Sequence, residues 1–139
     1  MSSISIEEFK KIKQKKHKYN AKSTCVDGIL FPSKGHAQYY VHLKFQKRAG
    51  VIKNIFREIP LRYQIGIDAP WHKLTFDFMV QNLDNTMTFI EFKGMITKDF
   101  IHRLEAVQCF YKDISIKIAY KDKEEKMQHF RIEDCYTVM

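Results

Sequence analysis

The chain has 139 residues, of which 45% are hydrophobic and 14% aromatic, and this composition is typical of one folded domain with its own core. Lysine and arginine outnumber aspartate and glutamate by 24 to 16, which gives a formal net charge of +8. That charge favours a nucleic-acid partner, makes an enzyme of acidic small molecules less attractive, and does not exclude an acidic protein partner.

The composition also argues against membrane and zinc-binding classes. No apolar run approaches the roughly 18 residues of a membrane span, and the N-terminal residues are too polar for a secretory signal. The three cysteines, Cys25, Cys109 and Cys135, are widely spaced and form no Cys-x-x-Cys pair, which indicates free thiols in a reducing compartment. The histidines form no His-x₃-His pair. We expect a cytoplasmic protein without a membrane partner.

The first segment, residues 1–18, is predicted to be a short basic helix or arm, followed by a single domain over 19–139. Ser5–Glu8 is a capping-box pattern that opens the helix. The arm is either a solvated, partly frayed segment or a contact with the DNA backbone, and its candidate residues are Lys10, Lys11, Lys13, Lys15, Lys16 and Lys18.

A tight hairpin and a helix come next. Asp27-Gly28 between two apolar pairs indicates a hairpin within Thr24–Phe31. Pro32-Ser33 then starts a helix that runs to about Ala49 and stops at Gly50. Residues at helical spacing predict its buried face, namely Ala37, Tyr40, Val41 and Phe45.

Val51–Ile67 is rich in Ile, Phe and Tyr and is predicted to be one strand, or two short strands separated at Pro60. The loop Asp68–Trp71 follows. Trp71 is a core residue, a loop anchor or a residue that stacks on DNA, and the first two readings are favoured.

The last third of the chain is predicted to contain a helix and two strands. Thr97 is the expected N-cap of a helix through about Lys112, with an inner stripe of Ile101, Leu104, Val107, Gln108 and Tyr111. Its N-terminal turns offer free N–H groups to a phosphate. Lys98, His102 and Arg103 are therefore candidate DNA contacts, as is Lys34 in the preceding helix, and the alternative for each helix residue is an ordinary solvated face. Strands are expected at Ile114–Ile118 and, weakly, at His129–Ile132.

The central stretch is predicted to be a β-hairpin whose strands, Leu74–Val80 and Met87–Phe92, flank the polar cluster Asn82–Asn85. Alternation places Asp77 on one face of the first strand and places an apolar set on the other, namely Leu74, Phe76, Phe78 and Val80. Glu91 and Lys93 share a face of the second strand. A loop of three or five residues, or a bulge, brings Asp77 and Glu91 to the same face, and we predict one of these.

Two carboxylates and a backbone carbonyl form a hard-oxygen site that suits Mg²⁺ or Mn²⁺. A lysine beside such a metal can orient an attacking water or stabilise charge in the transition state of phosphoryl transfer. The alternative is an ordinary surface salt bridge between these residues on a hairpin.

Asp77 on one strand, with Glu91-Phe92-Lys93 on the next, resembles the PD-(D/E)xK nuclease superfamily, with Phe76 where its proline often stands. The predicted order of elements matches the αβββαβ core of that superfamily. The resemblance therefore implies a restriction-endonuclease-like α/β (α+β) fold with a mixed central sheet flanked by helices. The runs Val26–Ile29 and Phe31–Lys34 resemble a group of small phage-encoded members of unsettled function. The likeness extends over about Lys18–Tyr120.

The chain departs from that pattern at His36, because the first core helix of these proteins normally supplies a glutamate just after Ser-Lys-x. A histidine can bind Mn²⁺ or act as a base, but it does not add the negative charge that helps hold Mg²⁺. Three outcomes are open: activity with one metal, preference for Mn²⁺, or DNA binding without cleavage.

The resemblance implies a metal-dependent endodeoxyribonuclease that uses Mg²⁺ or Mn²⁺. Asp77, Glu91, the Phe92 carbonyl and His36 would hold the metal, and Lys93 would serve the attacking water. Small members of the superfamily often act as homodimers on branched DNA, as Holliday-junction resolvases do, so recombination or replication intermediates are expected substrates. The alternatives are a non-catalytic DNA-binding module of the same fold and an inhibitor or adaptor that binds an acidic protein.

Overall fold

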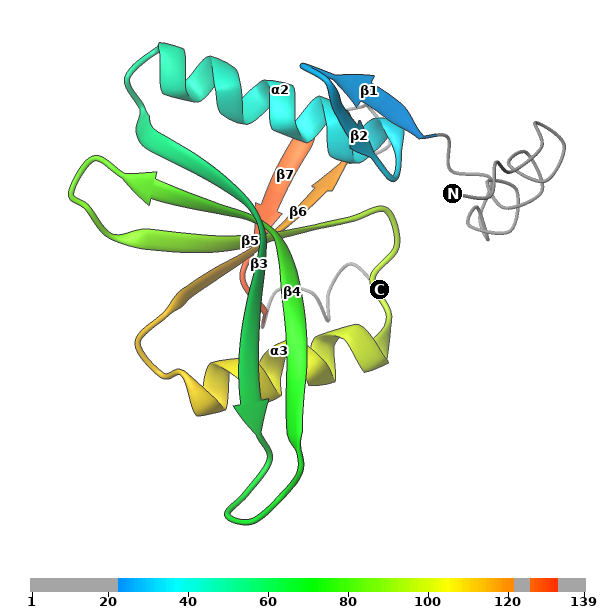
Figure 1. The fold of residues 1–139 in the computed structure, drawn as a ribbon, viewed down its shortest axis with the longest axis vertical. Helices are drawn as coiled ribbons and strands as arrows, with labels where there is room; N and C mark the ends of the chain where they lie inside the picture. The colour runs from blue at the N-terminus through cyan, green and yellow to red at the C-terminus, as the bar shows by residue number, and fades with distance from the viewer. Residues whose placement is uncertain (1–22, 122–125, 133–139) are drawn as a thin grey trace, which may run out of the picture. The chain divides into compact units, whose positions relative to one another are not determined.

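The computed structural model describes residues 23–121 and 126–132 (Figure 1). The predicted N-terminal arm, residues 122–125 and Cys135 lie outside these ranges. The chain divides into two compact units, residues 1–38 and 39–139. Among the described helices, none is both long and apolar enough to span a bilayer.

The first unit contains a two-stranded antiparallel hairpin, β1 (Thr24–Val26) and β2 (Ile29–Phe31), with Val26 opposite Ile29. The two turn residues, Asp27 and Gly28, have φ of 53° and 75°, as the mirror-image type I′ turn requires. The predicted Asp-Gly hairpin is therefore confirmed. Helix α2 (Lys34–Arg48) begins in this unit.

The second unit contains the rest of α2. The last helical residue is Arg48, and the predicted stop residue Gly50 follows the helix at a φ of 77°, with the N–H of Val51 donating to the carbonyl of Gln46 at 2.9 Å. The predicted buried face is wrong in part, because Phe45 is 62% exposed whereas Tyr39 and Leu43 are fully buried. Apolar residues occupy several stripes of this helix, so periodicity alone did not select the one that faces the sheet.

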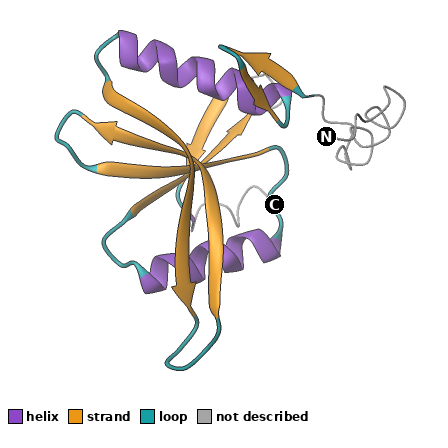
Figure 2. Ribbon diagram, in the orientation of Figure 1, coloured by secondary structure: helices purple, strands orange, loops and turns teal. Residues whose placement is uncertain are grey.

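The second unit is built on a mixed five-stranded sheet in the order β3-β4-β5-β6-β7 (Figure 2). Neighbouring strands are antiparallel except β5 and β6, which are parallel and are joined by helix α3 (Lys98–Phe110). The protein is therefore of the α+β class with a mixed sheet, as predicted. The strands are β3 (Ile52–Gln64), β4 (Trp71–Asn82), β5 (Met87–Lys93), β6 (Ser115–Lys121) and β7 (Met127–Phe130).

Strand β3 runs through Pro60 without a break, which confirms the first of the two alternatives. Proline is tolerated there because β3 is an edge strand and the missing N–H can face solvent. Strand β7 begins two residues before the predicted His129. Trp71 is the first residue of β4 and is 57% exposed, so the core reading is wrong; its ring meets the edge of Phe110 at 5.6 Å between centroids.

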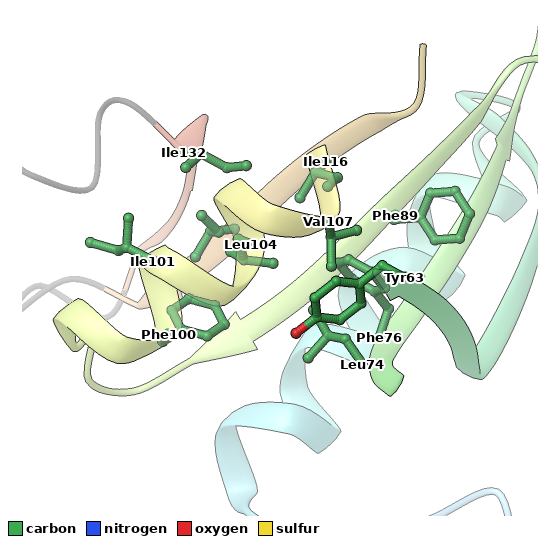
Figure 3. Packing of buried hydrophobic residues seen from close by; sticks show 11 residues of the cluster. Tyr63, Leu74, Phe76, Phe89, Phe100, Ile101, Leu104, Val107, Ile116 and Ile132 are labelled. Atoms are coloured by element: carbon green, nitrogen blue, oxygen red, sulfur yellow. The ribbon is translucent and has the colours of Figure 1, made fainter. Parts of the chain in front are cut away.

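The main core lies between α3 and one face of the sheet (Figure 3). Thr97 caps α3, since its Oγ accepts the N–H of Phe100 at 3.3 Å, as predicted. The expected stripe of Ile101, Leu104 and Val107 is buried, with Gln108 and Tyr111 only partly buried beside it. The cluster comprises Tyr63, Leu74, Phe76, Phe89, Phe100, Ile101, Leu104, Val107, Ile116, Ile118 and Ile132.

The predicted apolar face of β4 is divided between two packing regions, which corrects the expected regular alternation. The Phe76 ring lies 5.3 Å from the Phe89 ring in the α3 cluster. The Phe78 ring instead lies 5.4 Å from Tyr39 of α2, which also contacts Phe92 at 5.9 Å. Because Phe89 and Phe92 are three residues apart on β5, they face opposite sides of the sheet. Phe76 and Phe78 therefore face opposite sides too, and β4 changes direction at Asp77 between them.

Replacing Phe76 with alanine should lower the free energy of unfolding by about 3–5 kcal/mol, because the ring is completely buried in the α3 cluster. Phe45→Ala, the matched control on the exposed side of α2, should change it by less than about 0.5 kcal/mol. Urea unfolding of both variants measures the difference. Equal losses would show that the assigned core is incorrect.

Candidate active site

The register of the β4–β5 hairpin brings Asp77 and Glu91 together. The last backbone pair of the two strands is Phe78 with Ile90, so one step further along the same register Asp77 stands opposite Glu91. The loop is closed by the Asn82 N–H, which donates to the Thr86 carbonyl at 2.8 Å, and leaves three residues, 83–85, between them. The predicted three-residue loop is confirmed, and its register makes Asp77 and Glu91 neighbours across the hairpin.

Where β4 and β5 stop pairing, the carboxyl groups of Asp77 and Glu91 accept hydrogen bonds from main-chain N–H groups in place of backbone carbonyls. The Asp77 N–H donates to Glu91 Oε1 at 3.2 Å, and the Phe92 N–H donates to Asp77 Oδ2 at 2.9 Å. Each acidic side chain thus accepts a main-chain N–H from the opposite strand. These bonds hold both carboxyl groups in the gap between the strands and fix their positions relative to Phe92.

Strand β3, on the other side of β4 from β5, also departs from a regular ladder next to Asp77. Strand β3 pairs with β4 on both sides of this point, as Arg57 with Phe78 and Ile59 with Phe76. Glu58 lies between the two pairs and has a φ of 51°, a conformation that is uncommon for a residue other than glycine. Strained backbone of this kind is often found at functional sites. In Figure 1 the long β3–β4 ribbon bends midway, and its distal half passes α3.

The environment of Glu91 strongly favours its protonated form. The residue is 5% exposed. Burial, then a hydrogen bond to the Asp77 side chain and the negative charge of Asp77, raise the pKa of Glu91 to about 9, while the Lys93 ammonium acts in the opposite direction. At neutral pH in the absence of a cation, Glu91 therefore keeps its proton, and positive charge placed beside the pair would favour its release.

This pKa predicts how stability depends on pH in the metal-free protein. Between the ordinary glutamate value of 4.5 and about 9, the folded state binds more protons at Glu91 than the unfolded state does. The contribution is complete below the lower value and is lost as the pH rises through the upper one, with a slope of up to about 1.4 kcal/mol per pH unit. Glu91→Gln should flatten the pH dependence measured by urea unfolding in a chelator. Parallel curves for both proteins would contradict it.

Lys93 lies on the same face of β5 as Glu91, two residues further on. Its Nζ is 4.7 Å from the centroid of the Phe100 ring, in the first turn of α3. A cation above an aromatic face is held by the ring quadrupole. Lys93 therefore has a defined position beside the carboxyl pair.

His36 lies at the third helical position of α2, in the first unit. Its N–H donates to Ser33 Oγ at 3.2 Å, and its Nδ1 lies 2.5 Å from the same oxygen. These contacts make Ser33 and His36 an N-capping pair. The approach of His36 to Asp77 and Glu91 stays a prediction. Within the described ranges, no three His, Cys, Asp or Glu side chains gather into a group that could hold a metal ion.

The DNA-contact candidates on α3 have other interactions as well. His102 Nδ1 lies 3.7 Å from Glu105 Oε2, and Arg103 Nη2 donates to the Lys73 carbonyl at 3.5 Å. Lys98 is the exposed first residue of α3, and Lys34 is the first residue of α2. Their contacts with DNA stay predictions.

A second polar cluster, which was not predicted from the sequence, brings Tyr39 and His42 of α2 together with His129 of β7. The Tyr39 hydroxyl oxygen and His129 Nε2 are 2.8 Å apart, although 90 positions separate the two residues. No short motif links residues so distant, and only the alternation pattern around His129 offered a signal.

The family model described as "Protein of unknown function (DUF1064)" matches residues 16–128, which include every residue of the candidate active site. The chain belongs to this family. A search of curated proteins found no match for this DUF1064 member. A solved structure titled "Crystal structure of SSO0001" is similar at 14% identity and a TM-score of 0.41, over 74% of this chain. The chain spans 60% of the length of that protein.

Proposed function

We propose that this DUF1064 protein is a metal-dependent endodeoxyribonuclease of the PD-(D/E)xK superfamily. The observation that carries the proposal is the position of Asp77 opposite Glu91 at the end of the β4–β5 pairing, with Lys93 on the same face as Glu91. Acid on one strand and acid-x-lysine on its neighbour is the superfamily pattern. The bend of β4 at Asp77 gives the pattern a structural setting that an ordinary surface salt bridge does not require.

The residues present fit a hard divalent cation. The Asp77 and Glu91 carboxylates and the Phe92 carbonyl would hold Mg²⁺ or Mn²⁺, which both prefer oxygen ligands. When bound, the cation would supply positive charge for a phosphate oxygen and acidify a bound water. The Lys93 ammonium would orient the attacking water and balance the charge that develops on the phosphate.

The formal charge of +8 supports DNA as the substrate, because phosphate neutralisation supplies most non-specific affinity. The superfamily pattern extends the proposal to branched recombination or replication intermediates, a homodimer, and a phage or mobile-element setting. The second candidate function is a DNA-binding module of the same fold that does not cleave DNA. It is favoured because His36, which stands where the superfamily carries an acid, makes capping contacts with Ser33.

One panel of DNA substrates tests the proposal. Four-way junction, flap, linear duplex and single-stranded DNA are each incubated with the protein in Mg²⁺, Mn²⁺ or EDTA. Nicking that requires a metal ion is the expected result. Salt-sensitive binding without nicking would support the second candidate, and no affinity for any DNA would favour an adaptor of acidic proteins.

The metal preference should reveal the role of His36. A nitrogen ligand suits Mn²⁺ better than Mg²⁺, so higher activity in Mn²⁺ is expected. His36→Glu should narrow or reverse this gap, and glutamate at this position also suits a capping box with Ser33, which should preserve the helix start. Cleavage rates of both proteins in both metals are compared. An unchanged preference would place His36 outside the coordination sphere.

A further inference from the structure

The face of the sheet opposite the α3 cluster carries a row of residues across three strands. Phe92 of β5 is paired with Ala119 of β6, and Ala119 is paired with His129 of β7. Directly paired residues share a face of a sheet. The Tyr39 ring of α2 contacts both ends of the row, at 5.9 Å from Phe92 and 5.6 Å from His129. The small, fully buried Ala119 lies between these two ends.

Two of the groups around His129, Lys117 and His42, can carry positive charge. Lys117 lies two residues before Ala119 on β6, so it shares the face of His129 and is exposed like it. The His42 ring of α2 is 6.1 Å from the His129 ring, and its Nε2 is a buried atom without a hydrogen-bond partner among the described residues. Tyr39, His42, Lys117 and His129 meet here, and Lys121, two residues after Ala119 on β6, shares the same face.

Tyr39 serves this cluster as a hydrogen-bonding group rather than as a nucleophile. Burial raises the pKa of the Tyr39 phenol above its ordinary value, so the hydroxyl keeps its proton. The hydroxyl can therefore donate to His129 Nε2, which puts the proton of a neutral imidazole on Nδ1. Tyr39 in this way orients the His129 ring.

The charges in the cluster favour an anion over a metal ion. Burial first, and then the charges of His42 and Lys117, lower the pKa of His129. Because the positive charges of His42 and Lys117 disfavour a positive charge on His129, they would also oppose the binding of a metal cation. A bound anion would relieve the same repulsion.

We propose that His129 and Lys117, with His42 beside them, form a binding site for a phosphate group on the α2 side of β6 and β7. The favoured source is a backbone phosphate of DNA. Alternation along β5 places Glu91 on the face of the sheet opposite Phe92 and His129, so the phosphate bound here would be a contact separate from the scissile phosphate at Asp77 and Glu91. The net charge of +8 supports DNA as the source of that phosphate. That the phosphate comes from DNA rests on the proposed function, whereas the phosphate site itself does not.

The site is tested by the NMR titration of the histidine rings in the full chain, with inorganic phosphate and with a short DNA duplex as separate probes in EDTA. Both probes should shift the His129 signals and raise its pKa, because a phosphate stabilises the imidazolium. A response to inorganic phosphate alone would support a free phosphate or nucleotide as the ligand. No response to either probe would overturn the site.

Binding of fluorescent duplex DNA by His129→Gln and Lys117→Met gives a second readout. Each variant should lose about fivefold to tenfold in affinity near pH 6, and His129→Gln should also lose the tightening between about pH 8 and pH 6. His72→Gln, on β4 and stacked on Tyr63, is the matched control and should bind as wild type. Wild-type binding by both cluster variants would exclude DNA contact here. Metal-dependent cleavage by the same proteins reports separately on the proposed function.

Discussion

Asp77→Asn should lower the rate of metal-dependent DNA cleavage by at least about 10³-fold, with a change in DNA affinity of less than about threefold. The substitution removes the negative charge but keeps the size of the side chain and an oxygen that can accept the Phe92 N–H. Affinity should persist because dispersed lysines and arginines supply it. Single-turnover cleavage and fluorescence anisotropy are measured on the same preparation.

Asp68→Asn is the matched control for loss of one carboxylate. Asp68 lies in the β3–β4 turn at a φ of 65°, which asparagine tolerates. This variant should cut DNA at the wild-type rate. If Asp77→Asn retains wild-type cleavage, the carboxyl pair is not the catalytic centre.

Lys93→Met should lower the cleavage rate by about 10²-fold or more while leaving DNA affinity near that of wild type. Methionine keeps an apolar stem that can cover the Phe100 ring, so folding should be preserved, and thermal unfolding checks this. The effect should fall on kcat rather than KM, because the ammonium is expected to act in the transition state.

Lys112→Met, at an exposed lysine just after α3, controls for the loss of one positive charge. Its cleavage rate should match that of wild type. Equal activity of Lys93→Met and Lys112→Met would remove Lys93 from the catalytic group.

Short-range chemistry was the part of this structure that the sequence predicted well. The Asp27-Gly28 turn, the Thr97 cap and the three-residue loop after Asn82 each depend on a few neighbouring residues. The loop length then fixed the register and placed Asp77 opposite Glu91. The candidate site was predictable because it lies within one hairpin.

Features that depend on distant packing were not predictable in the same way. The division between Phe76 and Phe78 arises from the bend at Asp77, which involves Glu58 on another strand. Tyr39 rather than Phe45 is buried because its ring packs against Phe78 of β4 and Phe92 of β5. His129 contacts Tyr39 and His42 of α2 because the strand order of the sheet places β7 beside β6. Periodicity within one segment contains none of this information.

The most direct test of the central claim is cleavage of an end-labelled four-way junction by wild type and Asp77→Asn, purified side by side, in Mn²⁺ and in EDTA. We predict that wild type cuts in Mn²⁺, that EDTA stops the reaction, and that the variant binds the junction without cutting it. Equal cutting by the two proteins, or no cutting by wild type in Mn²⁺, would contradict a nuclease site at Asp77, Glu91 and Lys93.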